Sequence, residues 1–399
     1  MISVSPRLRQ PIRNSHDGPI QPMISVLHVI DTGGPGGAET VFLHCATQLD
    51  PTRFSSTAVV GSDNWLAHRI RENGFEPAIA PARGSFNLPY LRRIAGIARR
   101  VRADLICAHL YGTAVYASIL GAIKSIPVIS VFHGGADISA ADRFTSIKAA
   151  IIRNGSRRVV FVSGSLRDEL KGTLRIPSSR SVIIPNGVDT TTFRRGRDHS
   201  IRDELHLPPD AILVGAVGNI RPAKAYDNFM RAARALADRS NRFYFVVAGE
   251  CSGRLAEELM RLRSELELGD RLFFLGLRSD VPTVLHNLDV FVLSSKSEGF
   301  SIACVEAMAC EVPVVATRSG GPEEILGKDC GILVAPGAER ELADAIFRVA
   351  HEPGLAEQLS QVALKRAREE YSLKTMLSRH EALYEDVLGH NPRHLRYGS

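Results

Sequence analysis

The sequence lacks any long apolar run. None of its hydrophobic segments approaches the roughly 18 consecutive apolar residues expected of a membrane-spanning helix, and its N-terminal region has no apolar core of the secretory signal type. With 44% hydrophobic and 23% charged residues, the composition is that of an ordinary soluble globular chain. We therefore expect a protein that stays in the cytosol.

The sequence also lacks the residue spacings that usually mark a metal site. Its six cysteines are scattered, none in a Cys-x-x-Cys pair or at Cys/His ligand spacing, and we interpret them as reduced thiols in the core. There is no Asp-x-Asp pair of the kind that holds a divalent cation against a diphosphate. We expect neither a metal ion nor another cofactor.

Aromatic residues are few, at 6%, and no nucleic-acid recognition motif accompanies the arginines, so nucleic acid is not an expected partner. The positive charge is nevertheless uneven. Residues 1–190 contain 22 Lys+Arg against 13 Asp+Glu, whereas residues 191–399 contain 27 against 30. Much of the excess lies in Arg92, Arg93, Arg99, Arg100 and Arg102 and in Arg153, Arg157 and Arg158. These arginines are either solvated helix faces or a surface that attracts an anionic membrane or acceptor.

The length of 399 residues suggests two domains. Short apolar segments typical of strands alternate with helical segments along the chain, which predicts an α/β protein with two parallel, doubly wound sheets. We expect a mobile tail at 1–21, a first domain at 22–190, a second at 191–372 and a final helical segment at 373–399. Ligands of such sheets bind beyond the carboxyl ends of the strands.

The stretch from Asp289 to Glu324 has the most informative pattern. An apolar strand, Val290 to Leu293, is followed by a polar turn and then by a helical pattern with Ser301 as its N-cap. The unpaired amides and the dipole of such a helix favour a phosphate at its N-terminus. Glu298 and Glu306 would border that phosphate, and carboxylates readily accept hydrogen bonds from hydroxyls. A phosphate with hydroxyls on both sides describes a nucleotide sugar.

Three further strand ends carry candidate residues. The Gly-rich segment from Asp31 to Thr40 fits neither the dinucleotide fingerprint nor a P-loop, and alone it is either a tight turn or a ligand cradle. His133 follows the strand Val128 to Phe132 and precedes two glycines, where a histidine is either a structural hydrogen-bonding group or a catalytic one. Arg221 and Lys224 follow a strand of the second domain and would suit a diphosphate, although a surface pair is the alternative.

Together, Glu298, Gly299, Phe300, Ser301 and Glu306 resemble the signature of the retaining glycosyltransferases of family 4, in which Glu-Gly-Phe is followed by a second Glu eight residues after the first. The resemblance covers most of the chain. It implies the GT-B fold, in which two Rossmann-like domains face a central cleft. It also implies that the first domain serves the acceptor, that the second binds the nucleotide sugar, and that the last helix crosses back to the first domain.

The resemblance assigns roles to individual residues. Lys224, Arg221 and the amides after Glu298 would neutralise the leaving diphosphate in place of a metal ion. The remaining implied residues are Gly36 and Gly37 of the glycine loop, Glu306 at the ribose, and Glu298 and His133 at the transferred sugar, with Gly299, Phe300 and Ser301 also on the donor side. Two positions depart from the family pattern, because Asn219 stands where an arginine is usual and Ala225 replaces a glycine.

We therefore expect a metal-independent transferase that moves a hexosyl unit from a nucleotide sugar, with UDP favoured over GDP, to a lipid-linked or oligosaccharide acceptor. Its expected setting is surface polysaccharide biosynthesis, peripheral on the inner face of the membrane. One alternative is an epimerase or hydrolase on the same fold, which would need a carboxylate to move a proton or activate water. A second is a nucleotide-sugar-binding protein without turnover, against which the joint presence of Glu298, Glu306, Lys224 and His133 argues.

Overall fold

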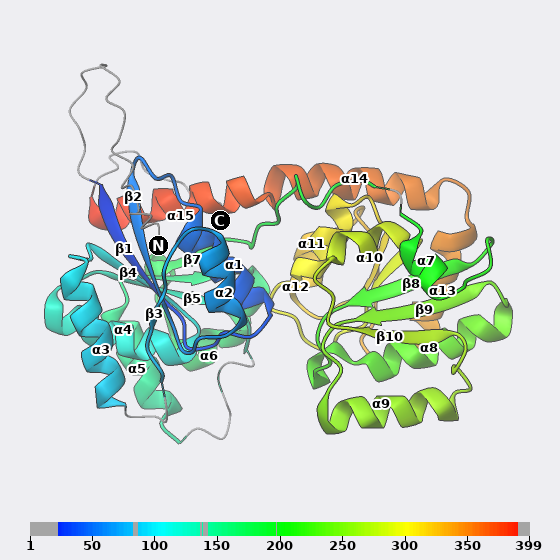
Figure 1. The fold of residues 1–399 in the computed structure, drawn as a ribbon, viewed down its shortest axis with the longest axis horizontal. Coiled ribbons are helices and arrows are strands. Elements are labelled where there is room, and N and C mark those ends of the chain that lie inside the picture. The colour runs from blue at the N-terminus through cyan, green and yellow to red at the C-terminus, as the bar shows by residue number, and fades with distance from the viewer. Residues whose placement is uncertain (1–22, 83–86, 136–137, 139–142, 197, 390–399) are drawn as a thin grey trace, which may run out of the picture.

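The structure is a computed structural model that describes residues 23–82, 87–135, 138, 143–196 and 198–389. Figure 1 shows two α/β units side by side, with the last two helices running along one edge of both. The tail predicted at 1–21 lies outside the described residues. No helix among those described combines the length and the hydrophobicity needed to cross a bilayer.

The first unit contains seven parallel strands in the order β3-β2-β1-β4-β5-β6-β7. The strands are β1 (Ile24–Val29), β2 (Phe54–Val60), β3 (Ala78–Ile79), β4 (Leu105–His109), β5 (Val128–Phe132), β6 (Arg158–Phe161) and β7 (Ser181–Ile183). The helices are α1 (Gly37–Thr47), α2 (Trp65–Glu72), α3 (Leu88–Arg100), α4 (Tyr111–Lys124), α5 (Thr145–Gly155) and α6 (Gly164–Leu174), with a 3-10 turn, η2, at Ser178–Arg180.

The second unit contains six parallel strands in the order β10-β9-β8-β11-β12-β13. The strands are β8 (Ile212–Val217), β9 (Phe243–Ala248), β10 (Leu272–Gly276), β11 (Val290–Leu293), β12 (Val314–Thr317) and β13 (Ile332–Val334). The helices are α8 (Tyr226–Arg239), α9 (Gly253–Glu265), α10 (Val281–Asn287), α11 (Ile302–Ala309), α12 (Gly321–Leu326), α13 (Glu339–His351) and α14 (Leu355–Glu370), and a 3-10 turn, η3, lies at Pro222–Lys224.

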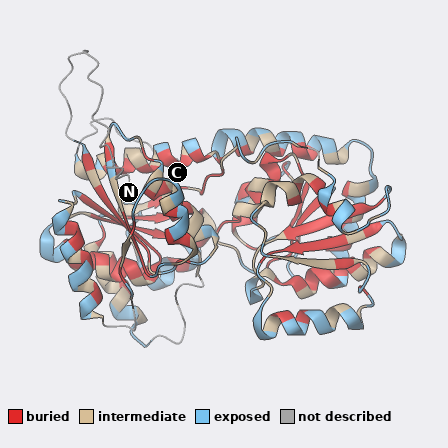
Figure 2. Ribbon diagram, in the orientation of Figure 1, coloured by how far each residue is buried: buried red, intermediate tan, exposed pale blue. Residues whose placement is uncertain are grey.

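The strands at the centre of both sheets are buried on both faces, as Figure 2 shows, because helices cover each face. In the first unit, α1 packs on one face and α3 and α4 on the other. This arrangement confirms the prediction of two parallel, doubly wound sheets.

Two short helices were not predicted from the sequence. The first, α7 (Ser200–Glu204), lies in the connector that we expected to be irregular, and Ile201 is its buried residue. The second, α10, begins after Asp280 and buries Val284 and Leu285. Each covers too few residues to show a helical repeat, so packing against the second unit determines its structure.

The chain passes between the two units twice. The first passage lies between β7 and β8, and the second lies at Tyr371 to Leu373, just before α15 (Leu373–Leu388). The two passages are in contact, because Val188 forms an isolated β-bridge with Ser372 and its amide donates to the Tyr371 carbonyl at 2.9 Å. Beyond this point α15 packs on the first sheet, where Leu377 and Tyr384 join the same cluster as residues of β1 and β4.

Candidate functional site

The Lys224 ammonium and the Glu298 carboxylate form an ion pair at the carboxyl ends of β8 and β11. These strands are neighbours although other elements separate them in sequence, which makes this edge the topological switch point of the second sheet. Nζ of Lys224 lies 2.7 Å from Oε1 of Glu298, and the Ser295 hydroxyl donates to the same oxygen at 2.7 Å. The lysine retains further N–H donors for an incoming anion.

The backbone before and after η3 determines where Lys224 lies. A Cβ on Gly218 would stand 3.2 Å from Cε of the lysine, so the glycine leaves room for the lysine stem. Ala225 adopts the left-handed conformation, with φ of 47°, before α8 begins. Glycine takes up that conformation without steric cost, which explains why glycine is usual at this position in the family that the sequence resembles.

Arg221 and Asn219 occupy different environments. Arg221 is exposed, and among the described residues none forms an ion pair with it. Asn219 instead joins the two units, since its side-chain amide donates to the Pro35 carbonyl at 3.0 Å and its oxygen accepts from the Glu250 amide at 2.9 Å. The position at which an arginine was expected therefore holds the glycine loop of the first unit against the end of β8.

The N-terminus of α11 lies beside this ion pair. The Ser301 hydroxyl accepts from the Cys304 amide at 3.3 Å, which confirms Ser301 as the N-cap. The Phe300 ring is nearly buried and packs edge-on against Tyr371, with ring centroids 5.7 Å apart. Both side chains are thus engaged within the protein, and what this turn can offer a ligand is its main-chain amides.

Glu306 lies in the second turn of α11 and is partly buried. No hydrogen bond or ion pair joins its carboxylate to another described residue. Burial raises the pKa of this carboxyl to about 7. Hydroxyl groups that donate to the carboxylate would stabilise its charged form and lower this pKa.

Gly36 and Gly37 lie where the glycine loop meets the second unit. Gly36 is the N-cap residue of α1, and a Cβ on it would meet the Glu39 carboxylate. A Cβ on Gly37 would stand 3.2 Å from Cδ1 of Ile302, the first residue of α11. The structure therefore brings the loop of the first unit to the helix that carries Glu306.

His133, immediately after β5, lies at the same meeting point of the two units. A Cβ on Gly299 would stand only 2.5 Å from the His133 carbonyl oxygen, so glycine permits this close approach. The side chain of His133 is hydrogen-bonded, Nε2 to Nδ1 of His109, at 3.0 Å. Burial lowers the pKa of His133 to about 3, so its imidazole is neutral near pH 7.

Two further contacts between the units could not be found from the sequence. The Glu324 carboxylate accepts hydrogen bonds from the Gly164 amide at 2.9 Å and the Ser165 amide at 2.5 Å, at the N-terminus of α6. The Ser163 hydroxyl donates to the Gly299 carbonyl at 2.5 Å. These contacts hold the turn after Glu298 against the first unit. Their partners lie more than 130 residues apart, so no local pattern indicates them.

Two family models match the chain in succession. Residues 35–192 match the model described as Glycosyltransferase Family 4, and residues 198–366 match the model described as Glycosyl transferases group 1. Together they span about four-fifths of the chain.

Curated relatives point in the same direction. A D-inositol 3-phosphate glycosyltransferase of Actinosynnema mirum is 35% identical over 211 residues, which is 50% of this chain and 51% of that protein. The chain thus spans about half the length of this relative. An N-acetyl-alpha-D-glucosaminyl L-malate synthase of Bacillus anthracis is 25% identical over 313 residues, covering 76% of this chain and 80% of that protein.

Solved structures resemble the whole fold. Alr3699/HepE of Anabaena, crystallised with UDP, has a TM-score of 0.80 and 21% identity, covering 91% of this chain and 100% of that one. A glycosyltransferase of Rickettsia africae has a TM-score of 0.82 and 19% identity, covering 92% and 100%. At these sequence identities, the similarity shows that the fold is shared and nothing more specific.

Proposed function

The chain belongs to the glycosyltransferases of family 4 and has the GT-B fold, and on this premise we propose that it transfers a hexosyl unit from a nucleotide sugar to a lipid-linked or oligosaccharide acceptor. The observation that carries the proposal is the pair of Lys224 and Glu298 at the switch point of the second sheet, with the glycine loop of the first unit beside it. A cation next to a hydroxyl acceptor suits a diphosphate joined to a sugar.

The proposed donor is a UDP-sugar, with a GDP-sugar as the second choice. The Anabaena protein that this chain resembles in fold was crystallised with UDP and with UDP-glucose. In this chain, Glu306 would accept hydrogen bonds from the ribose hydroxyls, and the main-chain amides of the turn before α11 would face the diphosphate.

The proposed reaction retains the anomeric configuration and needs no metal ion. The bond between the sugar C1 and the diphosphate oxygen breaks while the acceptor oxygen bonds to C1 on the same face. The acceptor proton passes to the departing phosphate. Lys224, with Arg221 from the exposed side, would stabilise the charge on the leaving group. Glu298 would hold hydroxyls of the transferred sugar, and His133 would contact that sugar from the opposite unit.

Calorimetric titration with UDP-, GDP- and ADP-sugars in EDTA tests the donor site. We expect one nucleotide to bind without metal and Lys224→Ala and Glu306→Ala to weaken it. Lys296→Ala is the matched control for Lys224→Ala, because Lys296 is an exposed lysine of the turn that carries Glu298 and its removal changes the net charge equally. The proposed donor site would be contradicted if Lys224→Ala and Glu306→Ala left binding unchanged, or if all three substitutions weakened it equally.

For the acceptor, we propose that the first unit docks on an anionic membrane, as a peripheral enzyme of surface polysaccharide biosynthesis. A groove of about 640 Å³ between α4 and α5 is lined mostly by apolar side chains, of which Ile123 and Ile147 are 64% and 56% exposed. The neighbouring helix α3 carries exposed Arg92, Arg93 and Arg99. Apolar side chains near exposed cations suit the surface of a bilayer that contains anionic lipids.

Sedimentation with phosphatidylcholine vesicles, with and without phosphatidylglycerol, tests the docking surface. We expect binding only to the anionic vesicles, and reduced binding for Ile123→Ser with Ile147→Ser and for charge reversal of Arg92, Arg93 and Arg99. The control is Met260→Ser, which removes an exposed apolar side chain from α9 of the second unit. If the protein does not bind anionic vesicles, or if Met260→Ser reduces binding as much as the substitutions on α3, α4 and α5, this surface does not dock on membranes.

A further inference from the structure

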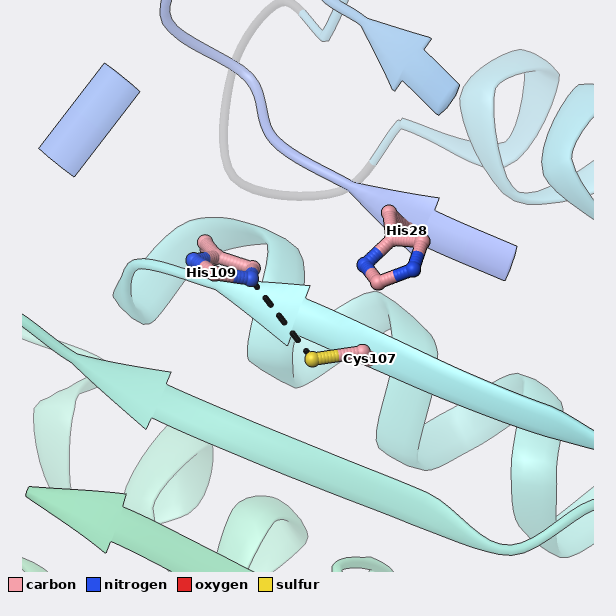
Figure 3. Close-up of side chains that lie close together, drawn as sticks. All are labelled: His28, Cys107 and His109. Atoms are coloured by element: carbon pink, nitrogen blue, oxygen red, sulfur yellow. Dashed lines mark hydrogen bonds between the residues drawn. The ribbon is translucent and has the colours of Figure 1, made fainter. Parts of the chain in front are cut away.

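A row of buried polar side chains lies on the face of the first sheet that α15 covers. His28 of β1 and Cys107 of β4 are directly paired across the sheet, and His109 is two residues further along β4, so all three point to the same face. Figure 3 shows His28, Cys107 and His109 gathered in this way. All three are fully buried. Polar groups in such a place require partners.

Hydrogen bonds connect this row to His133. The Tyr384 hydroxyl of α15 lies 3.3 Å from Sγ of Cys107, and Sγ lies 3.5 Å from Nε2 of His109. The other nitrogen of His109, Nδ1, is 3.0 Å from Nε2 of His133. A continuous series of hydrogen bonds, called the hydrogen-bond chain below, therefore runs from Tyr384 through Cys107 and His109 to His133.

The hydrogen-bond chain allows two directions of proton donation. In the first, the Tyr384 hydroxyl donates to Sγ, the thiol donates to Nε2 of His109, and Nδ1–H of His109 donates to Nε2 of His133. In the second, His133 donates to His109, His109 donates to Sγ, and the thiol donates to the Tyr384 oxygen, which leaves the tyrosine proton without an acceptor among the described residues. Each direction therefore leaves one buried donor without a partner, Nδ1–H of His133 in the first and the Tyr384 hydroxyl in the second. The first direction is favoured because His133 lies where the two units meet, beside the proposed donor site, whereas Tyr384 is fully buried in the core under α15.

From this geometry we propose that Cys107 and His109 are positioning residues that fix His133 as the tautomer protonated at Nδ1. Nδ1 of His133 is buried and has no hydrogen-bond partner among the described residues. An N–H donor is therefore presented at this atom. If the proposed function holds, a hydroxyl of the bound donor sugar is the acceptor, and His133 acts as a neutral hydrogen-bond donor.

The same row suggests a competing occupant. The ligand atoms of His28, Cys107 and His109 lie within 4.8 Å of one another, which is close enough for a soft metal ion such as zinc. Both ring nitrogens of His28 are without partners in the described structure. A metal would require Cys107 as a thiolate and would remove the thiol proton on which the proposed chain depends.

Long-range ¹H–¹⁵N correlation spectra of protein labelled with ¹⁵N-histidine test the proposal without any substrate. The His133 signals are identified by their loss in His133→Asn. We expect wild-type His133 to be protonated at Nδ1 at pH 7. His109→Asn and His109→Leu form a matched pair, because the two new side chains have the same shape and only asparagine can donate to Nε2 of His133. We expect the asparagine variant to keep the tautomer and the leucine variant to lose it.

A second matched pair addresses the thiol. Cys107→Ala should change the His133 tautomer, whereas Cys45→Ala should not, because Cys45 is equally buried in the same cluster and takes no part in the described hydrogen bonds. In the transfer reaction, His109→Leu should lower kcat about fivefold, the size expected from one neutral hydrogen bond, with His109→Asn near wild type.

Three outcomes would overturn the inference: a wild-type His133 protonated at Nε2, a tautomer that neither His109→Leu nor Cys107→Ala changes, or a full equivalent of zinc in protein purified without metal resin. The spectra also separate this inference from the proposed function. Tautomers that respond as expected in a protein that binds no nucleotide sugar would support the positioning role and refute the function. Transfer activity in a protein whose His133 tautomer does not respond to the substitutions would support the function and refute the positioning role.

Discussion

Substituting Glu306 by glutamine should raise the stability of this protein above neutral pH while weakening donor binding. Burial raises the pKa of the Glu306 carboxyl from 4.5 to about 7. The folded protein therefore holds a proton at pH values where the unfolded chain has lost it. The stability that this protonated carboxyl contributes is complete below about pH 4.5, falls as the pH rises, and is lost above about pH 7.

The size of the effect follows from the same shift. At about 1.4 kcal/mol for each pKa unit, the shift corresponds to at most about 3 kcal/mol. Because the side chain is only partly buried, solvent reduces this, and we expect about 1–3 kcal/mol. Glu306→Gln removes the ionisation while keeping the shape, so the variant should be more stable than wild type by that amount at pH 8. At pH 5 the two proteins should differ little.

Denaturant unfolding of both proteins at pH 5 and pH 8 measures this difference. Glu369→Gln is the control, because Glu369 is an exposed glutamate on the neighbouring helix α14. In parallel, Glu306→Gln should weaken nucleotide binding roughly tenfold or more at pH 8, since a charged hydrogen-bond acceptor is lost. A change in unfolding free energy that is equal at both pH values, or that matches the change in Glu369→Gln, would refute a Glu306 carboxyl whose pKa is raised by burial.

Three other substitutions give independent tests. Lys224→Met should lower the unfolding free energy by about 1–3 kcal/mol, because Glu298 keeps its charge in a largely covered position without its ion-pair partner. Adding Glu298→Gln should restore stability in denaturant unfolding, and stability that stays low would count against the pairing. Gly299→Ala places a Cβ 2.5 Å from the main-chain oxygen of His133, so the two units should separate and solution X-ray scattering should show a larger radius of gyration; an unchanged radius would mean that the contact between the units is not held at this glycine. Ala225→Gly should raise the melting temperature of the protein, since a left-handed non-glycine residue costs about 1 kcal/mol, and a lower melting temperature would show that the packing of the methyl group matters more.

Much of the candidate site could be predicted because its signals are local. The apolar strand β11, the polar turn and the N-cap Ser301 follow one another within a few residues, and hydrophobic pattern and capping preference act over that distance. The alternation of strands and helices likewise predicted both parallel sheets. Lys224 and Glu298 were recognised separately, each at the end of a strand.

Other features of the site depend on contacts that sequence patterns do not record. The sequence indicated Phe300 as a residue of the turn after Glu298, but not that its ring packs against Tyr371 in the connection between the units. His109 was not predicted as a site residue, because no local pattern distinguishes a histidine that acts on the site from one that is simply buried at a strand end. Only the position of β4 beside β5 places its Nδ1 next to His133.

The sequence by itself determined the two α/β sheets, the turn that carries Glu298 and the helix that carries Glu306, because each is specified by neighbouring residues. The tertiary structure decided which of these groups meet. The adjacency of β8 and β11 pairs Lys224 with Glu298, and the packing of one unit on the other brings Glu324 to the N-terminus of α6. Such contacts depend on the order of the strands in each sheet and on how the two units dock. Strand order and docking are determined by the packing of the whole chain.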